Sequence, residues 1–205
     1  MQYLGIEFSL KNQPRLDGSF IPFGVWERAY LKGAEKPFKI AVEREGGLVS
    51  VFETKLRGPE FAEANYRYAE RFVKMLLWSV GGWRVTLCGD DALAKRMQDE
   101  YREGGKREFD VGFMQDVYER PFEIVLSDEA HFPQTHEQTR KVGGHTNGCR
   151  IGFDAGGSDR KVSAVIDGQT VYSEEVVWHP KTSEDPQYQY DGIVAAFKTA
   201  ASKLP

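Results

Sequence analysis

The chain has 205 residues, of which 40% are hydrophobic and 13% aromatic, which is enough for one large core or for a domain plus part of another. Its net charge of −4 gives no electrostatic basis for binding nucleic acid or an anionic membrane. The chain starts without a basic region followed by an apolar stretch, it lacks an apolar run of the roughly 20 residues that a membrane span needs, and its two distant cysteines suit free thiols, so we expect a cytoplasmic protein.

The first part of the chain is predicted to form β-structure. The segments Phe20–Leu31 and Pro37–Arg44 are rich in aromatic and β-branched residues, and Leu48–Thr54 alternates between apolar and polar residues. Gly46 and Gly47 supply a turn between the last two segments. We therefore expect antiparallel hairpins at the N-terminus.

A long helix is expected after these hairpins. Pro59 suits a first helical turn, and the pair Gly81-Gly82 should end the helix. Between them, apolar side chains recur at helical spacing: Ala62, Tyr66, Ala69, Val73, Leu76, Leu77 and Val80. This spacing predicts one apolar face that packs on a sheet.

An α/β layer is predicted to follow the long helix. Trp83–Cys88 has the composition of a strand, and Gly89-Asp90-Asp91 should cap a second helix that runs to Gly104-Gly105. Phe122–Leu126 is expected to be a short buried strand. The succession of helix, strand, helix and strand is typical of an α/β layer.

A polar segment, 127–147, contains a proline and two consecutive glycines, and it predicts a linker. We place a domain boundary near residue 145, which gives an accessory domain at 1–145 and a second domain at 146–205. The second domain should contain three strands, a polar loop and a helix, with Asp167-Gly168 as a hairpin turn. The expected ranges are Cys149–Asp154, Lys161–Asp167, Gln169–Trp178, Pro180–Asp191 and Gly192–Lys203.

The sequence DAGGSDRK at 154–161 carries the main chemical signal. A Walker or Rossmann loop would open a helix, whereas the residues that follow here alternate with period two, so we expect a hairpin tip. The amides of Gly156 and Gly157 could hold an anion, with Ser158 as a further donor. Asp154 would hold Mg²⁺ that bridges to phosphate, and Lys161 would offset phosphate charge. A glycine hairpin without any ligand explains the motif equally well.

The order of elements around this motif resembles the start of the actin and sugar-kinase superfamily, whose first hairpin binds phosphate. Within that superfamily, IGFDAGGSDRKVSAVIDG is most similar to the ROK family of bacterial sugar kinases and related repressors, whose usual opening is close to D-I-G-G-T-K. Ser158 keeps the hydroxyl of that Thr, whereas Asp159 stands where many members have Lys. ERFVKMLLWSVGGW and FDVGFMQDVYERPFEI resemble the extra N-terminal domain of some large ROK-like proteins.

The resemblance implies an α/β (α+β) protein in which the N-terminal hairpins and α/β layer precede the β-β-β-α start of a ribonuclease H-like lobe. It implies ATP and Mg²⁺ as cofactors and a sugar as the second substrate. The family's general base, zinc-binding cysteines and adenosine loop lie after the first helix, so we expect the N-terminal portion of a longer protein, inactive alone. The alternative is a non-catalytic regulatory or interaction module with a degenerate kinase-like segment.

Two further expectations concern contacts. In the family fold the first strand is central, so the edge of Cys149–Asp154 would here lack a partner and could pair with a second copy of the chain, giving a homodimer. The three histidines and the cysteine between residues 131 and 149 match no common zinc pattern, which favours a solvated loop. The tryptophans of the accessory domain are expected in its core: Trp26, Trp78 and Trp83.

Overall fold

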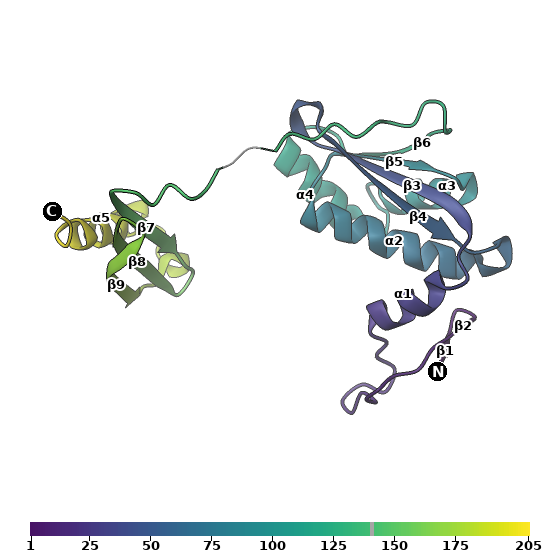
Figure 1. The fold of residues 1–205 in the computed structure, drawn as a ribbon, viewed down its shortest axis with the longest axis horizontal. Helices are drawn as coiled ribbons and strands as arrows, with labels where there is room; N and C mark the ends of the chain where they lie inside the picture. Colours follow the sequence, from purple (N-terminus) through teal and green to yellow (C-terminus); the bar gives the residue numbers. More distant parts are fainter. Residues whose placement is uncertain (140–141) are drawn as a thin grey trace. The chain divides into compact units, whose positions relative to one another are not determined.

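The computed structural model describes residues 1–139 and 142–205. The chain divides into two compact units, Met1–Thr139 and Arg140–Pro205, and each is described below by itself (Figure 1). Both units combine helices with a β-sheet, so the protein belongs to the mixed α/β (α+β) class, as predicted. Within the described ranges, none of the helices has the length and apolar character of a membrane span.

The first unit is built on a four-stranded sheet with the order β4-β3-β5-β6. Its strands are β3 (Lys36–Glu43), β4 (Val49–Leu56), β5 (Arg84–Cys88) and β6 (Glu123–Leu126). β3 pairs antiparallel with β4 and β5, whereas β5 and β6 are parallel. Gly46 and Gly47 turn the β3–β4 hairpin with φ values of 66° and 71°, which glycine adopts without strain. The predicted hairpin is confirmed.

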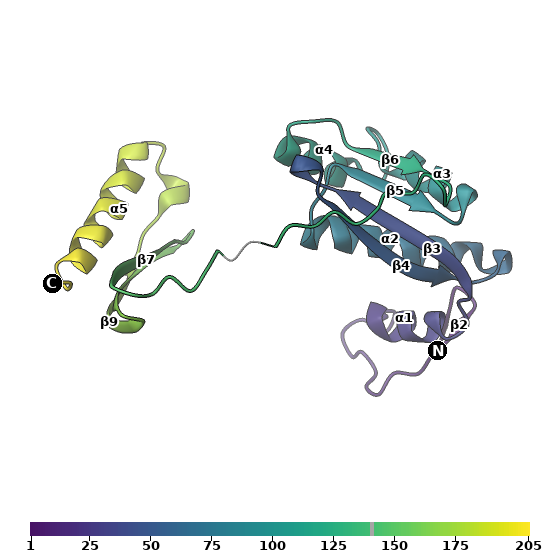
Figure 2. The ribbon, with the colours of Figure 1, turned by 45° about the horizontal axis from the view of Figure 1, so that its top comes forward.

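Three helices share one core with this sheet (Figure 2). They are α2 (Ala62–Ser79), α3 (Asp91–Glu100) and α4 (Glu108–Tyr118). Alternate residues of β3, Phe38, Ile40 and Val42, are buried in that core, as the period of a strand requires. The Asp90 carboxylate caps α3 by accepting a hydrogen bond from the Leu93 amide at 2.9 Å.

The prediction for the second helix was wrong at its end. α3 stops at Glu100, and a separate helix, α4, begins at Glu108 after a turn in which Gly104 has a φ of 72°. The glycines therefore connect two helices. The apolar pattern of α4 is hard to recognise, because Phe109 and Phe113 are exposed beside the buried Val111 and Met114.

The N-terminal elements are β1 (Gln2–Tyr3), β2 (Ile6–Glu7) and the helix α1 (Phe23–Leu31). The strand predicted over Phe20–Leu31 is wrong: aromatic content suggested a strand, but Trp26 and Tyr30 lie four residues apart, which is helical spacing. Trp26 stacks on Tyr30 with ring centroids 5.3 Å apart, and Tyr30 stacks on Tyr68 of α2 at 4.6 Å. These rings attach α1 to α2.

Two of the three tryptophans of this unit are not core residues. Trp26 is buried as predicted, whereas Trp78 is 47% exposed and Trp83 is half-buried. Trp78 lies near the end of α2, where its ring stacks on Phe113 at 4.8 Å. Its indole Nε1 donates to Asp110 Oδ1 at 2.6 Å. The polar edge of the ring is thereby satisfied while its face stays at the surface.

The first part of the predicted linker belongs to the first unit. The Val49 amide donates to the His136 carbonyl at 2.8 Å, and the His136 amide donates to the Val49 carbonyl at 2.9 Å. The Arg44 guanidinium donates to Glu137 at 2.6 Å. This segment therefore pairs with the first residue of β4 at the outer edge of the sheet and satisfies the backbone groups of Val49. The predicted linker also contains residues 140–141, which lie outside the described residues.

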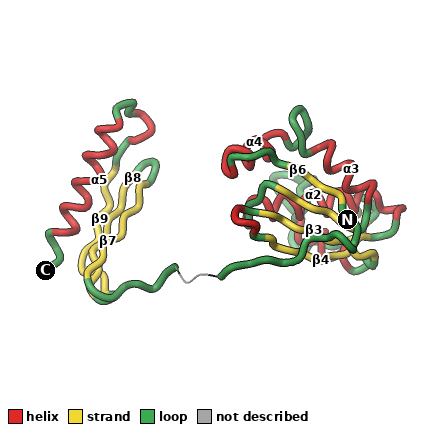
Figure 3. Tube along the Cα trace, turned by 90° about the horizontal axis from the view of Figure 1, so that it is seen from above, coloured by secondary structure: helices red, strands yellow, loops and turns green. Residues whose placement is uncertain are grey.

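The second unit is a three-stranded antiparallel sheet followed by one helix (Figure 3). Its elements are β7 (Cys149–Ala155), β8 (Asp159–Ile166), β9 (Gln169–Val177) and α5 (Pro186–Ala201). Asp167 and Gly168 form the β8–β9 turn with φ values of 48° and 82°, so the predicted hairpin is confirmed. The buried core is small and joins one face of β8 to α5: Val162, Ala164, Ala196 and Ala200.

The helix α5 begins six residues earlier than predicted, at Pro186 instead of Gly192. Asp185 caps it by accepting a hydrogen bond from the Gln187 amide at 2.9 Å, and Pro186 suits the first turn. The first turns face solvent, so their polar residues are typical of a loop.

The strand β7 lies at one edge of this sheet and pairs with β8 alone among the described residues. Self-association of two chains through the other edge of β7 stays a prediction.

Candidate functional site

The candidate site is the tip that joins β7 to β8. Asp154 lies near the end of β7, opposite Lys161 of β8, and both side chains are exposed. Gly156, Gly157 and Ser158 connect the two strands. The structure thus places all five predicted site residues at one end of the sheet, as expected for residues so close in the sequence.

Trp178 holds this tip in place, a role that the sequence did not reveal. Its indole Nε1 donates to the Gly156 carbonyl at 2.7 Å, and its backbone amide donates to the Ser158 carbonyl at 3.0 Å. The side chain is 5% exposed and follows directly after β9. Because both ends of the glycine pair are bonded to one buried residue, the tip is fixed before any ligand arrives.

Close packing against backbone requires a glycine at position 156, whereas Gly157 faces the end of a flexible side chain. A Cβ atom on Gly156 would lie 2.5 Å from the Asp159 carbonyl oxygen. A Cβ atom on Gly157 would lie 2.8 Å from Cε and 3.0 Å from Nζ of Lys181. Lys181, in the loop after β9, therefore brings an ammonium group against the bare backbone of the tip. This contact could not be predicted from the sequence, because Lys181 is distant along the chain.

The charge of Lys161 is already engaged. Its ammonium group lies 2.5 Å from Asp159 Oδ1 and 3.9 Å from Glu175. The hydrogen bond from Lys161 lowers the pKa of Asp159, and the same bond raises the pKa of Lys161. The Ser158 hydroxyl donates to Asp159 Oδ2 at 3.4 Å. Lys161 is thus partly neutralised by neighbouring carboxylates, whereas the ammonium of Lys181 lies against Gly157.

The donor set at the tip bears on metal binding. In the described part of the chain, no group of three or more histidine, cysteine or carboxylate side chains could enclose a metal ion. Asp154 alone is an exposed carboxylate beside the glycine pair. Mg²⁺ commonly keeps several waters and binds through one or two carboxylates together with substrate phosphates. The residues present fit Mg²⁺ delivered with a phosphate, and they do not form a separate metal centre.

The histidines of the polar segment are exposed: His131, His136 and His145. His131 bonds to Asp128 Oδ1 at 2.7 Å, and His136 lies against the Gly47 carbonyl at 2.8 Å. Cys149 is exposed at the start of β7 and carries a free thiol. His131 and His136 thus have separate partners within the first unit.

Comparison with known proteins does not assign the chain to a family. No protein-family model matches the chain. The curated proteins likewise contain no match to it.

Proposed function

We propose that residues 146–205 are the first β-β-β-α segment of a ROK-like ATPase or sugar-kinase lobe, and that the β7–β8 tip binds phosphate of Mg²⁺-ATP. The observation that carries the proposal is the tip itself: a Gly156-Gly157 backbone that is exposed at Gly157, fixed by Trp178, and beside the ammonium of Lys181. A fixed, bare backbone next to a cation suits an anion. The topology supports it, because three antiparallel strands and a helix follow in the order that the resemblance implies.

Each residue has a defined role in this proposal. Backbone amides at Gly157 and Ser158 would donate to phosphate oxygens, and Lys181 would balance their charge. Asp154 would hold Mg²⁺ directly or through water. When bound, Mg²⁺-ATP supplies the phosphoryl group, and catalysis of its transfer to a sugar depends mainly on positioning and charge stabilisation. In such a lobe this chain would contribute positioning.

The test is an NMR titration of the 205-residue chain with Mg²⁺-ATP. We expect the amide signals of Gly156, Gly157 and Ser158 to shift in a saturable manner, and Asp154→Asn to abolish the part of the shift that depends on Mg²⁺. Glu184→Gln is the matched control, because Glu184 is an exposed carboxylate of the same unit. Unchanged tip signals at millimolar Mg²⁺-ATP would refute phosphate binding.

A second function, a non-catalytic regulatory or interaction module, is favoured by one specific observation. Lys161 is held by Asp159 and Glu175, so the tip carries three carboxylates with Asp154 and has less free positive charge than a phosphate site needs. Under this alternative, Asp159→Lys should create Mg²⁺-ATP binding that the natural chain lacks. Under the leading proposal, the natural chain binds already and the substitution changes affinity only modestly.

A further inference from the structure

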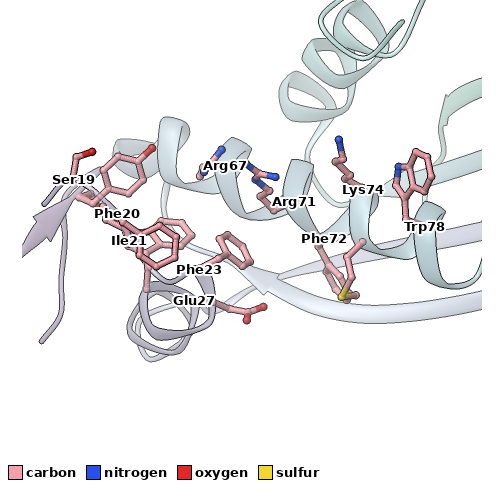
Figure 4. A pocket seen from close by; sticks show the side chains of 13 residues that line it. Ser19, Phe20, Ile21, Phe23, Glu27, Arg67, Arg71, Phe72, Lys74 and Trp78 are labelled. Atoms are coloured by element: carbon pink, nitrogen blue, oxygen red, sulfur yellow. Dashed lines mark hydrogen bonds between the residues drawn. The ribbon is translucent and has the colours of Figure 1, made fainter. Parts of the chain in front are cut away.

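The first unit contains a large pocket that is separate from the tip (Figure 4). Its volume is about 890 Å³, within the range of sites that hold drug-sized molecules. The walls come from the N-terminal segment, α1 and α2, and all of them belong to Met1–Thr139. Most of the lining is apolar or aromatic: Tyr3, Phe20, Ile21, Phe23, Phe72 and Met75.

One wall of this pocket is cationic. Arg67, Arg71 and Lys74 follow one another at spacings of four and three residues along α2, which places them on one face of the helix. At 1.5 Å per residue the row is about 10 Å long.

The two arginines are only weakly satisfied by the protein. Arg67 Nε is buried and lacks a hydrogen-bond partner in the described part of the chain. Arg71 Nε lies 3.9 Å from Glu70, whose carboxylate also contacts Arg107. Lys74 is different, because it pairs with Asp110 at 3.4 Å. A buried guanidinium nitrogen without an acceptor is costly, so an anion beside Arg67 and Arg71 would be stabilised there.

The opposite wall has a single acid, Glu27 of α1, which is half-buried. Burial raises the pKa of Glu27, and the charged group that opposes this effect is Arg28 rather than the cations of α2. In Figure 4 the Glu27 carboxylate and the three cations lie on different sides of the aromatic side chains. The pocket is therefore polarised, with positive charge along α2, apolar rings in the middle and an acid at α1.

We propose that this pocket binds a small organic anion, with one carboxylate-like or phosphate-like group at Arg67 and Arg71 and an apolar chain or ring among the aromatic residues. Guanidinium groups bind planar oxyanions in a bidentate manner, which explains arginine at both positions. The apolar body would bury against Phe20, Phe23 and Phe72. Glu27 would disfavour a second anionic group at the other end of the ligand.

The probe is decanoate, added below its micelle concentration to the 205-residue chain, and binding is measured by calorimetry. Decyl phosphate distinguishes the two kinds of anionic group, whereas decanol and decylamine keep the apolar chain and change its charge. We expect both anions to bind and the neutral and cationic analogues to bind at least about tenfold more weakly. Arg67→Gln with Arg71→Gln should weaken decanoate binding about 10- to 100-fold. Arg102→Gln, at an exposed position outside the pocket, is the control.

Two variants that introduce opposite charges at Met75 test whether charge in the pocket controls the binding of decanoate. Met75 is 52% exposed, lies in the helix beside the cations and tolerates either charge without loss of helix propensity. Met75→Glu should weaken decanoate binding and Met75→Lys should strengthen it, while both variants stay folded. Equal affinity for decanoate and decanol, the same decanoate affinity in the two Met75 variants, or no detectable binding of decanoate would each overturn the proposal.

Discussion

Replacing Arg107 by Met should destabilise the first unit by about 3 kcal/mol. Arg107 lies at the start of α4 and contacts Glu70 of α2, whose side chain is 2% exposed. Without Arg107, Glu70 keeps one ion pair among the described residues, with Arg71 at 3.9 Å. Breaking a buried ion pair from one side costs about 3–5 kcal/mol, and the 21% exposure of Arg107 favours the lower end. The same substitution removes an ion pair between Arg107 and Asp110, but Asp110 keeps its bonds from Lys74 and Trp78 and is less affected.

The double variant Glu70→Leu with Arg107→Met separates an ion-pair effect from a packing effect. It removes both charges and leaves apolar side chains of similar size, so its stability should lie close to that of the natural protein. The assay is urea unfolding followed through the amide NMR signals of β3, which report on the first unit alone. A cost below about 1 kcal/mol for the single variant, or a double variant as unstable as the sum of the single ones, would refute the reasoning.

Two other changes test the tip and the cap of α3. Trp178→Phe removes the hydrogen bond to Gly156, so it should cost about 1 kcal/mol and speed amide exchange at the tip; unchanged exchange would show that the indole does not hold the tip. Asp90→Ala should cost about 1 kcal/mol at neutral pH. Burial acts to raise the pKa of Asp90, but hydrogen bonds from Lys36 and the Leu93 amide outweigh it and leave the pKa below 3.8. The carboxylate therefore stabilises the fold above about pH 4, and this stabilisation should be lost as the pH falls through the folded-state pKa. The measurement is urea unfolding of the natural protein and of Asp90→Ala, at neutral pH and at a pH below that pKa. The same difference in stability between the two proteins at both pH values would contradict this prediction.

The sequence predicted elements whose signal is local. The alternation of Val162, Ala164 and Ile166 and the Asp167-Gly168 turn identify a hairpin directly, because period and turn chemistry act over a few residues. The helix at 23–31 is not predicted, because its aromatic composition is typical of a strand although Trp26 and Tyr30 have helical spacing. The early start of α5 was missed because its first turns are solvated on most sides, so they lack an apolar stripe.

The site shows the same division between local and distant contacts. Asp154, Gly157 and Lys161 could be grouped in advance because a hairpin brings neighbours in sequence together. Trp178 and Lys181 could not, since they reach the tip only when β9 has returned along β8. The pocket of the first unit is harder still, because its walls come from segments far apart in the chain. Its cationic row is visible in the sequence, but the aromatic residues opposite it depend on the aromatic packing of α1 on α2.

The small residues between α5 and its sheet set the distance between helix and sheet, and this distance affects the β7–β8 tip. Ala164, Ala196 and Ala200 leave little between helix and strand but methyl groups, and Gly192 brings the backbone of α5 against the Trp178 ring. The distance between α5 and the sheet therefore determines the position of the Trp178 ring, and Trp178 in turn holds the tip through its bond to Gly156. A larger side chain at one of these small residues should tilt α5 and displace the glycines of the tip without contacting them. The shape of the tip is thus controlled remotely, by side-chain volume on a helix that supplies none of its residues.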